Sequence, residues 1–167
     1  ILREMGAPAE AALVKVLRKG DTWAIDPALD VLSSQFDARQ PTEETRDALI
    51  QFIKKDKGSN RRKAIIALGG IKDEVAAEAA AEQLGDFAVC DLAGQSLRRM
   101  GPIAEKFVVP HLKNSNTFIR AEACKVLELI GTKKSVPALQ ALVRDFHTGQ
   151  AARQAIDAIN QRSKQKQ

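Results

Sequence analysis

The sequence predicts an all-α protein, an α-solenoid of about five antiparallel helix pairs. Two observations carry this prediction: glycine junctions about 30 residues apart, and an amphipathic helical segment on each side of them. The chain has 167 residues, 44% of them hydrophobic and 28% charged, so it is long and apolar enough to bury a core. It has no Tyr and one Trp, and it is rich in Ala and Leu, which favours helix over sheet.

The junctions are glycines that follow apolar residues. Gly70, Gly101 and Gly131 are 31 and 30 residues apart, and the 64 residues between Gly6 and Gly70 correspond to two units. The missing junction falls near 36–41. We expect each glycine to end the first helix of its pair in the left-handed conformation, which costs nothing without a Cβ.

Apolar residues at three-and-four spacing predict a helix on either side of each junction. The helices before the junctions are expected at 28–35, 61–68, 89–100, 119–130 and 151–160. The helices after them are expected at 9–17, 43–54, 73–84, 103–112 and 136–143. Pro8, Pro27 and Pro102 are expected to start helices, where a proline needs no N–H partner. Thr42 is expected to cap one.

Aromatic residues recur near the start of the first helix in successive units. Phe87, Phe118 and Phe146 are 31 and 28 residues apart, and Trp23 holds a similar place. Such a row fits stacking platforms for nucleic-acid bases, or an apolar plug repeated between units. We expect the plug, because equivalent positions in a repeat usually have the same packing role.

The region around the last two junctions carries a recognisable consensus. Its residues are Leu97, Met100–Glu105, Pro110–Leu112, Ile119–Ala123, Leu127, Ile130, Gly131 and Val136–Leu139. This pattern resembles the short bacterial HEAT repeat, also found in phycobilisome-lyase-like proteins. The resemblance covers nearly the whole chain and implies a right-handed superhelix, whose second helices line the concave side. Arg120 corresponds to the family's arginine near the start of a first helix. We match no chromophore-attachment residues, so the lyase activity is not implied.

We expect one HEAT-like repeat domain over residues 1–162 and a basic polar tail over 163–167. The chain begins with Ile1 inside an apparent helix, so we expect a fragment of a longer protein. It has no signal peptide and no apolar run of about 20 residues, so we expect no membrane insertion in this segment. The compartment stays open, with the cytoplasm favoured, because a fragment loses upstream targeting signals.

Residues with catalytic potential are few and scattered. Cys90 and Cys124 have no metal-ligand spacing and are expected to be buried, reduced thiols. His111 and His147 lie in no zinc or nucleophile motif and are expected to be structural. We therefore expect no catalytic residues, no metal, no cofactor and no enzyme activity.

The chain is basic, with a net charge of +5 and a pI of about 9.4. The candidate patch for an anionic partner comprises Lys54, Lys55, Lys57, Arg61, Arg62 and Lys63. Cations at helix C-termini also complement the helix dipole without any ligand. We predict a non-catalytic scaffold that binds a protein partner through an extended surface. The alternative is that this patch binds nucleic acid or another polyanion.

Overall fold

The computed structural model describes residues 7–19, 22–35, 40–56 and 58–165, which form helices and turns without any strand. The first half holds α1 (Ala7–Lys19), α2 (Thr22–Gln35), α3 (Glu43–Lys55), α4 (Ser59–Leu68) and α5 (Glu74–Leu84). The second half holds α6 (Cys90–Met100), η1 (Gly101–Ala104), α7 (Glu105–Val108), η2 (Val109–Lys113), α8 (Thr117–Ile130), α9 (Val136–Gln140) and α10 (Gly149–Gln165). The prediction of an all-α protein is confirmed.

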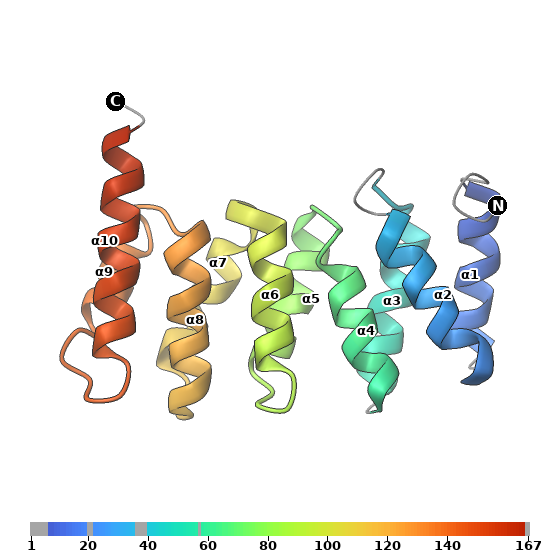
Figure 1. Cartoon of the computed structure of the whole chain (residues 1–167), viewed down its shortest axis with the longest axis horizontal. Helices are drawn as coiled ribbons and strands as arrows, with labels where there is room; N and C mark the ends of the chain where they lie inside the picture. The colour runs from blue at the N-terminus through green and yellow to red at the C-terminus, as the bar shows by residue number, and fades with distance from the viewer. Residues whose placement is uncertain (1–6, 20–21, 36–39, 57, 166–167) are drawn as a thin grey trace.

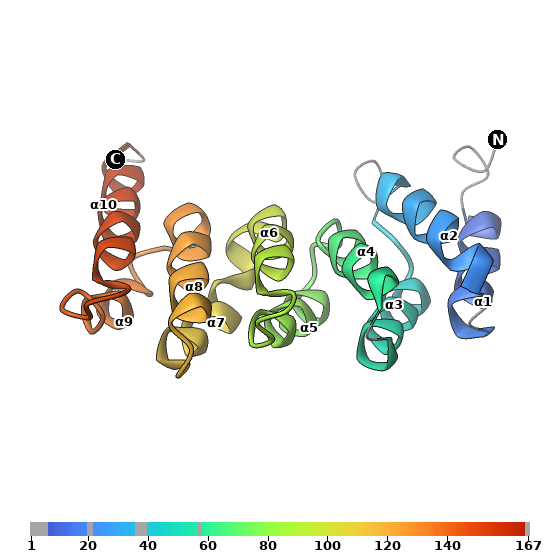
Figure 2. The same cartoon turned by 60° about the horizontal axis from the view of Figure 1, so that its bottom comes forward.

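The helices stand side by side in an extended row of two layers, with the chain ends at opposite ends of the row (Figure 1). The even-numbered helices form one layer, each packing against the next even one, and the odd-numbered helices α1, α3, α5 and α7 form the other. Figure 2 shows the same two layers from another side. Each unit therefore packs mainly against the units beside it in the sequence.

The row has two long edges, which are named here by their turns. The lower edge of Figure 1 holds turns that lead from an odd helix into the next even one, at 85–89, 114–116 and 141–148. The upper edge holds turns that lead from an even helix into the next odd one, at 69–73 and 131–135.

The core runs along the row between the two layers. Fully buried leucines and isoleucines from successive helices fill it, including Leu29, Leu49, Ile65, Leu97 and Leu127. The helix predicted at 119–130 is α8, and its apolar residues at three-and-four spacing are all buried: Ile119, Ala123, Val126, Leu127 and Ile130. The amphipathic pattern predicted for this helix is confirmed.

Prolines explain most of the differences between expected and observed helices. Pro27 does not start a helix but lies inside α2, on an exposed face, where its missing N–H removes one helical hydrogen bond. The helix expected at 103–112 is divided into η1, α7 and η2, with Pro102 and Pro110 near the starts of the two 3-10 segments. At the C-terminal end, α10 continues to Gln165 and includes residues expected in the polar tail.

The junction glycines serve close packing more than backbone conformation. Among the described residues only Gly101 has a positive φ, of 80°, whereas Gly69 and Gly131 have φ of −62° and −65°. Gly70 has no positive φ either, so the expected left-handed conformation is wrong for Gly70 and Gly131. A Cβ on Gly69 would lie 2.7 Å from Cα of Ser96, in the next unit, and one on Gly131 would lie 2.9 Å from Cδ1 of Ile159. Glycine here permits neighbouring units to approach closely.

Buried carboxylates fasten successive units at the upper edge. Oε1 of Glu10 accepts hydrogen bonds from the backbone N–H of Thr42 (2.7 Å) and from its hydroxyl (3.0 Å). Oε1 of Glu105 accepts the same pair from Thr132, at 2.8 and 3.0 Å. Thr42 in turn caps α3 by accepting from the N–H of Thr45, as predicted. Both carboxylates are buried, so these contacts give each of them hydrogen-bond donors in place of water.

Candidate functional site

The predicted basic patch lies around the turn between α3 and α4, at the lower edge. Lys54 and Lys55 end α3, while Arg61, Arg62 and Lys63 belong to the first turns of α4. Lys57, the sixth member, lies outside the described residues. The side chains of this predicted patch point to different neighbours.

Three of the five described cations are held by side chains of adjacent units. Arg61 is buried, and its guanidinium donates to Gln83 Oε1 (2.6 Å) and pairs with Asp86 Oδ2 (2.8 Å). These bonds make Arg61 a structural link between units.

Lys63 and Lys54 are held more loosely. Lys63 Nζ lies 2.6 Å from Asp26 Oδ1 and 3.1 Å from Asp30 Oδ1, both on α2. The hydrogen bond to Asp26, followed by that to Asp30, raises the pKa of Lys63. Lys54 Nζ lies 3.6 Å from Glu82 Oε2 in an exposed pair.

Lys55 and Arg62 are the members that face solvent. Neither is paired with a carboxylate in the described part of the chain, and Arg62 donates only to the carbonyl of Ala88, at 3.2 Å. The predicted six-residue patch therefore presents two exposed described cations with no carboxylate partner, next to the surface pair of Lys54.

The link made by Arg61 recurs in a later unit. Arg120 Nη2 lies 3.2 Å from Asp145 Oδ2, and both arginines precede their aspartate by 25 residues. The guanidinium of Arg120 also donates to the carbonyls of Asn114 and Ser115, at 2.9 and 3.0 Å. The arginine singled out by the family resemblance thus ties one turn of the lower edge to the next.

Asp145 also organises the turn that precedes α10. Its Oδ1 accepts from the hydroxyl and the N–H of Thr148, both at 2.8 Å, and from the N–H of His147 at 3.0 Å. The hydrogen bonds from Thr148, with smaller contributions from His147 and Arg120, lower the pKa of Asp145 to about 2. The carboxylate is therefore committed to the fold.

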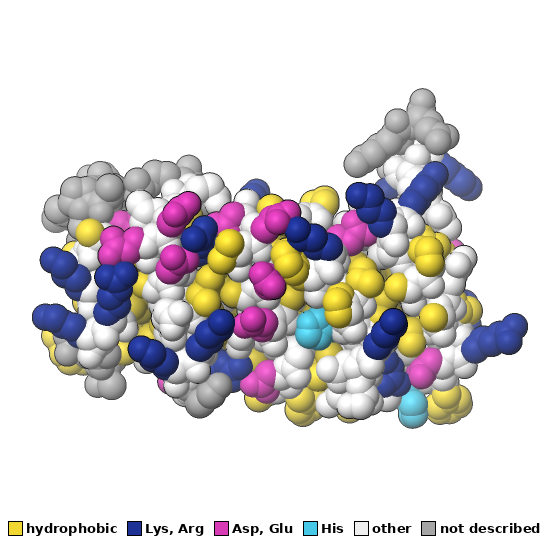
Figure 3. Space-filling view, turned by 180° about the vertical axis from the view of Figure 1, so that it is seen from behind, with side chains coloured by type: hydrophobic (Ala, Val, Ile, Leu, Met, Phe, Trp, Pro, Cys, Tyr) yellow, Lys and Arg dark blue, Asp and Glu magenta, His cyan; other side chains and the backbone are white. Residues whose placement is uncertain are grey.

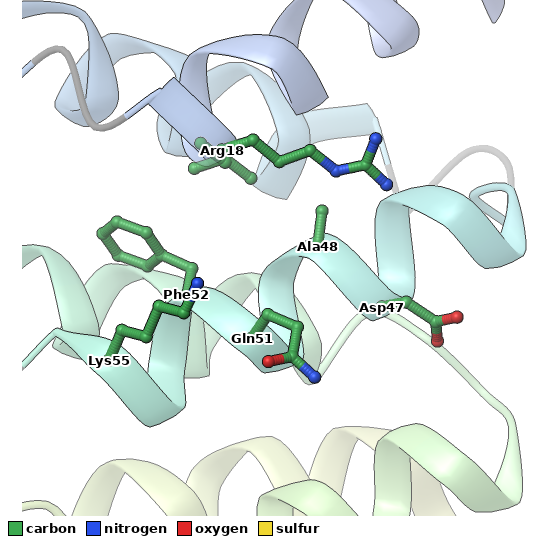
Figure 4. Close-up of a pocket in the computed structure, with 7 residues that line it drawn as sticks. Arg18, Asp47, Ala48, Gln51, Phe52 and Lys55 are labelled. Carbon is green, nitrogen blue, oxygen red and sulfur yellow. The ribbon is translucent and has the colours of Figure 1, made fainter.

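A hollow of about 340 Å³ opens between α1 and α3 on the odd-helix face (Figure 4). Leu17 and Ala48 are buried and Phe52 is half-buried, so its floor is apolar. Arg18 reaches across from α1, and Lys55 lies beside Phe52. Asp47 and Gln51 complete the lining. The combination of an apolar floor and a cationic rim was not predicted, because nothing in the repeat pattern distinguishes Phe52 from a core residue.

Charges on the odd-helix face are segregated by helix. Figure 3 shows a column of acidic side chains near the centre, with basic side chains on both sides of it. Glu74, Glu78 and Glu82 are exposed on α5, and Lys106 pairs with Glu74 at 2.7 Å. The cationic hollow between α1 and α3 thus lies to one side of an acidic ridge.

The repeated aromatics are exposed, contrary to the expected plug between units. Trp23 is 84% exposed, Phe87 58%, Phe118 67% and Phe146 95%. The rings of Phe87 and Phe118 lie 5.5 Å apart, centroid to centroid, and only partly cover each other. For Phe118, in α8, the reason is helical register: one residue corresponds to about 100° of rotation, so Ile119 enters the core while Phe118 beside it faces water. Phe87 and Phe146 lie in turns.

The residues with catalytic potential are dispersed. Cys90 and Cys124 are buried free thiols, as predicted; burial raises the pKa of both, that of Cys124 to about 11. His111 is half-buried, and because burial disfavours its charged form, its pKa is lowered. His147 is exposed. Within the described ranges no three His, Cys, Asp or Glu side chains gather as metal ligands. No described helix is long and apolar enough to cross a bilayer.

Comparison with known proteins supports the fold and goes no further. No family model matches the chain, and a search of curated proteins finds no significant match. One similar solved structure is described as the crystal structure of an engineered protein, a target of the Northeast Structural Genomics Consortium. It aligns with a TM-score of 0.55 and 20% sequence identity, over 96% of this chain and 87% of that one. At this identity the likeness concerns the fold alone.

Proposed function

We propose that this chain is a non-catalytic, protein-binding scaffold, built as a right-handed HEAT-type solenoid of about five helix pairs. Two observations support this architecture. Even-numbered helices pack against the next even helix and odd-numbered helices from α1 to α7 against the next odd one, and residues about one unit apart in the sequence contact each other. The hydroxyl of Ser96, for example, donates to the carbonyl of Ile65, 31 residues earlier, at 2.7 Å. Such an assembly offers a rigid, extended surface, which suits binding better than bond-making.

The observation that carries the binding role is the hollow between α1 and α3. Its floor of Leu17, Ala48 and Phe52 accepts an apolar side chain, and Arg18 and Lys55 stand where a neighbouring carboxylate would meet them. Arg18 pairs only at the surface, with Glu44 at 2.8 Å, so an acidic ligand can compete for it. We infer that the hollow takes an acidic peptide segment with an apolar anchor.

The test is selection of peptides from a random display library, followed by titration calorimetry of the selected peptides. We expect acidic peptides with an apolar anchor to bind the unmodified chain. Gln51→Trp, which fills the hollow from an exposed position, is expected to abolish that binding. Gln154→Trp, the same change on the exposed face of α10, serves as the matched control. Peptides that bind the two variants equally well would show that the hollow is not the contact.

A further inference from the structure

We propose that the lower edge of the row binds single-stranded nucleic acid, with bases stacked on its exposed aromatic rings and phosphates held by its free cations. This surface is separate from the α1–α3 hollow except for Lys55, at the hollow's rim. The inference therefore stands without the proposed protein-binding role. It rests on three features of the edge: exposed rings, cations without a carboxylate partner, and the order of rings and cations along the chain.

The rings are exposed side chains set among polar turn residues, and Phe87 and Phe118 form one pair 5.5 Å apart, centroid to centroid. Asp86 precedes Phe87, Asn116 caps the turn before Phe118, and Asp145 precedes Phe146. Exposed rings beside polar turn residues suit bases that stack on them.

The charges of the edge are biased towards cations. Asp86 and Asp145 are held by Arg61 and Arg120, which leaves only part of their charge available to solvent. Cationic side chains at or beside these turns are exposed without a carboxylate partner among the described residues: Lys55, Arg62, Lys113, Arg144 and Arg153. Exposed carboxylates are fewer, with Asp91 the clearest example. The surplus favours a polyanion.

The order of rings and cations matches a strand that carries both bases and phosphates. Where other units have an aromatic residue, the start of α4 has Ser59 and Asn60. Lys55 at the end of α3 and Arg62 near the start of α4 flank this turn. Trp23 lies at the start of α2, one unit earlier along the lower edge, and Phe87 lies before α6, one unit later. Hydrophobic side chains are visible along this edge from behind as well (Figure 3). A duplex keeps its bases inside the stack, so only a single strand can use the rings.

The test is fluorescence anisotropy with labelled oligo-deoxythymidylate of about 15 nucleotides at low salt, with a duplex of the same length for comparison. We expect the single strand to bind more tightly than the duplex. Phe87→Ala and Phe118→Ala are each expected to weaken binding roughly fivefold to hundredfold, the range for loss of one stacking ring. Arg62→Gln and Arg144→Gln should each reduce the dependence on salt by about one counterion.

Matched controls separate this surface from the rest of the molecule. Leu129→Ala and Ile66→Ala remove exposed apolar side chains from even-numbered helices away from the edge, and binding of the oligonucleotide is expected to be unchanged. Gln51→Trp, which tests the hollow, should also leave it unchanged. Circular dichroism would verify that each variant keeps its helix content.

Four outcomes would overturn the proposal. They are no complex at low salt, a duplex bound as tightly as the single strand, equal affinity in the phenylalanine variants, and displacement by poly-glutamate as effective as by unlabelled oligonucleotide. The last result would identify the edge as a surface for acidic proteins.

Discussion

The two long edges of the row use their repeated residues in opposite ways. At the upper edge, Glu10 and Glu105 are buried, and they bond to Thr42, the cap of α3, and to Thr132, in the turn after α8. At the lower edge, Phe87, Phe118 and Phe146 recur at similar spacing yet stay in solvent. Recurrence therefore does not by itself indicate a packing role. A recurring side chain that is buried holds neighbouring units together, whereas one that is exposed can contact a ligand.

Leu127→Ala is expected to give the largest loss of unfolding free energy, with which the changes at both edges can be compared. Leu127 is fully buried in α8, so we expect the free energy of unfolding to fall by about 2–5 kcal/mol. Leu129, two residues along the same helix, is 59% exposed, and Leu129→Ala is expected to cost far less. Urea titration of the two variants measures the difference. Equal losses would mean that the assigned core face of α8 is wrong.

Glu105→Leu tests whether the upper edge is a structural joint. The change leaves the N–H and hydroxyl of Thr132 without their acceptor, and we expect a loss of about 1–3 kcal/mol in unfolding free energy. Glu74→Leu is the matched control, because it removes only an exposed ion pair with Lys106, worth about 0–1 kcal/mol. Chemical denaturation should show a larger loss of unfolding free energy for Glu105→Leu than for Glu74→Leu. Equal losses would mean that Glu105 does not hold the units together.

Gly69→Ala compares the same substitution at the two edges. At the upper edge the new Cβ would lie 2.7 Å from Cα of Ser96, a backbone atom, so α6 must shift at a cost of about 1–3 kcal/mol. At the lower edge, Gly58→Ala would meet only the side-chain oxygen of Asp56, at 3.3 Å. Thermal unfolding should lower the Tm of the first variant more than that of the second, and the reverse order would contradict the close approach of units.

The smallest expected effect concerns Asp145, a lower-edge group that is tied into the fold. The pKa of Asp145 is about 2 in the folded chain, below its ordinary value of 3.8. Its contribution to stability is therefore complete above about pH 4 and is lost as the pH falls towards 2. In Asp145→Asn this part of the pH dependence should disappear from a series of Tm measurements. An unchanged pH profile in the variant would show that other carboxylates account for acid unfolding.

Sequence periodicity predicted the helices and their buried stripes well, because burial repeats with the helical period. The stripe on α8 and the cap at Thr42 are examples. Periodicity did not predict which of two neighbouring side chains is buried and which is exposed. Arg61 is buried and Arg62 exposed, and Ile119 is buried while Phe118 is not. Residues one apart point about 100° away from each other, so a spacing of about 30 residues fixes the unit but not the direction of the side chain.

The same limit explains the glycines and the hollow. Spacing located the junctions at Gly70 and Gly131, but the close approach of Gly69 to Ser96 and of Gly131 to Ile159 depends on how the units stack. The hollow between α1 and α3 is formed by two helices about 30 residues apart, and its depth depends on that stacking as well.

The central claim is that the recurring aromatics are a free surface and not part of the core. Urea unfolding of the triple variant Phe87→Ala, Phe118→Ala, Phe146→Ala tests it most directly. We predict an unfolding free energy within about 1 kcal/mol of the unmodified chain, because exposed side chains contribute little to stability. Buried phenylalanines would cost about 3–5 kcal/mol each, so a loss of that size would contradict the account.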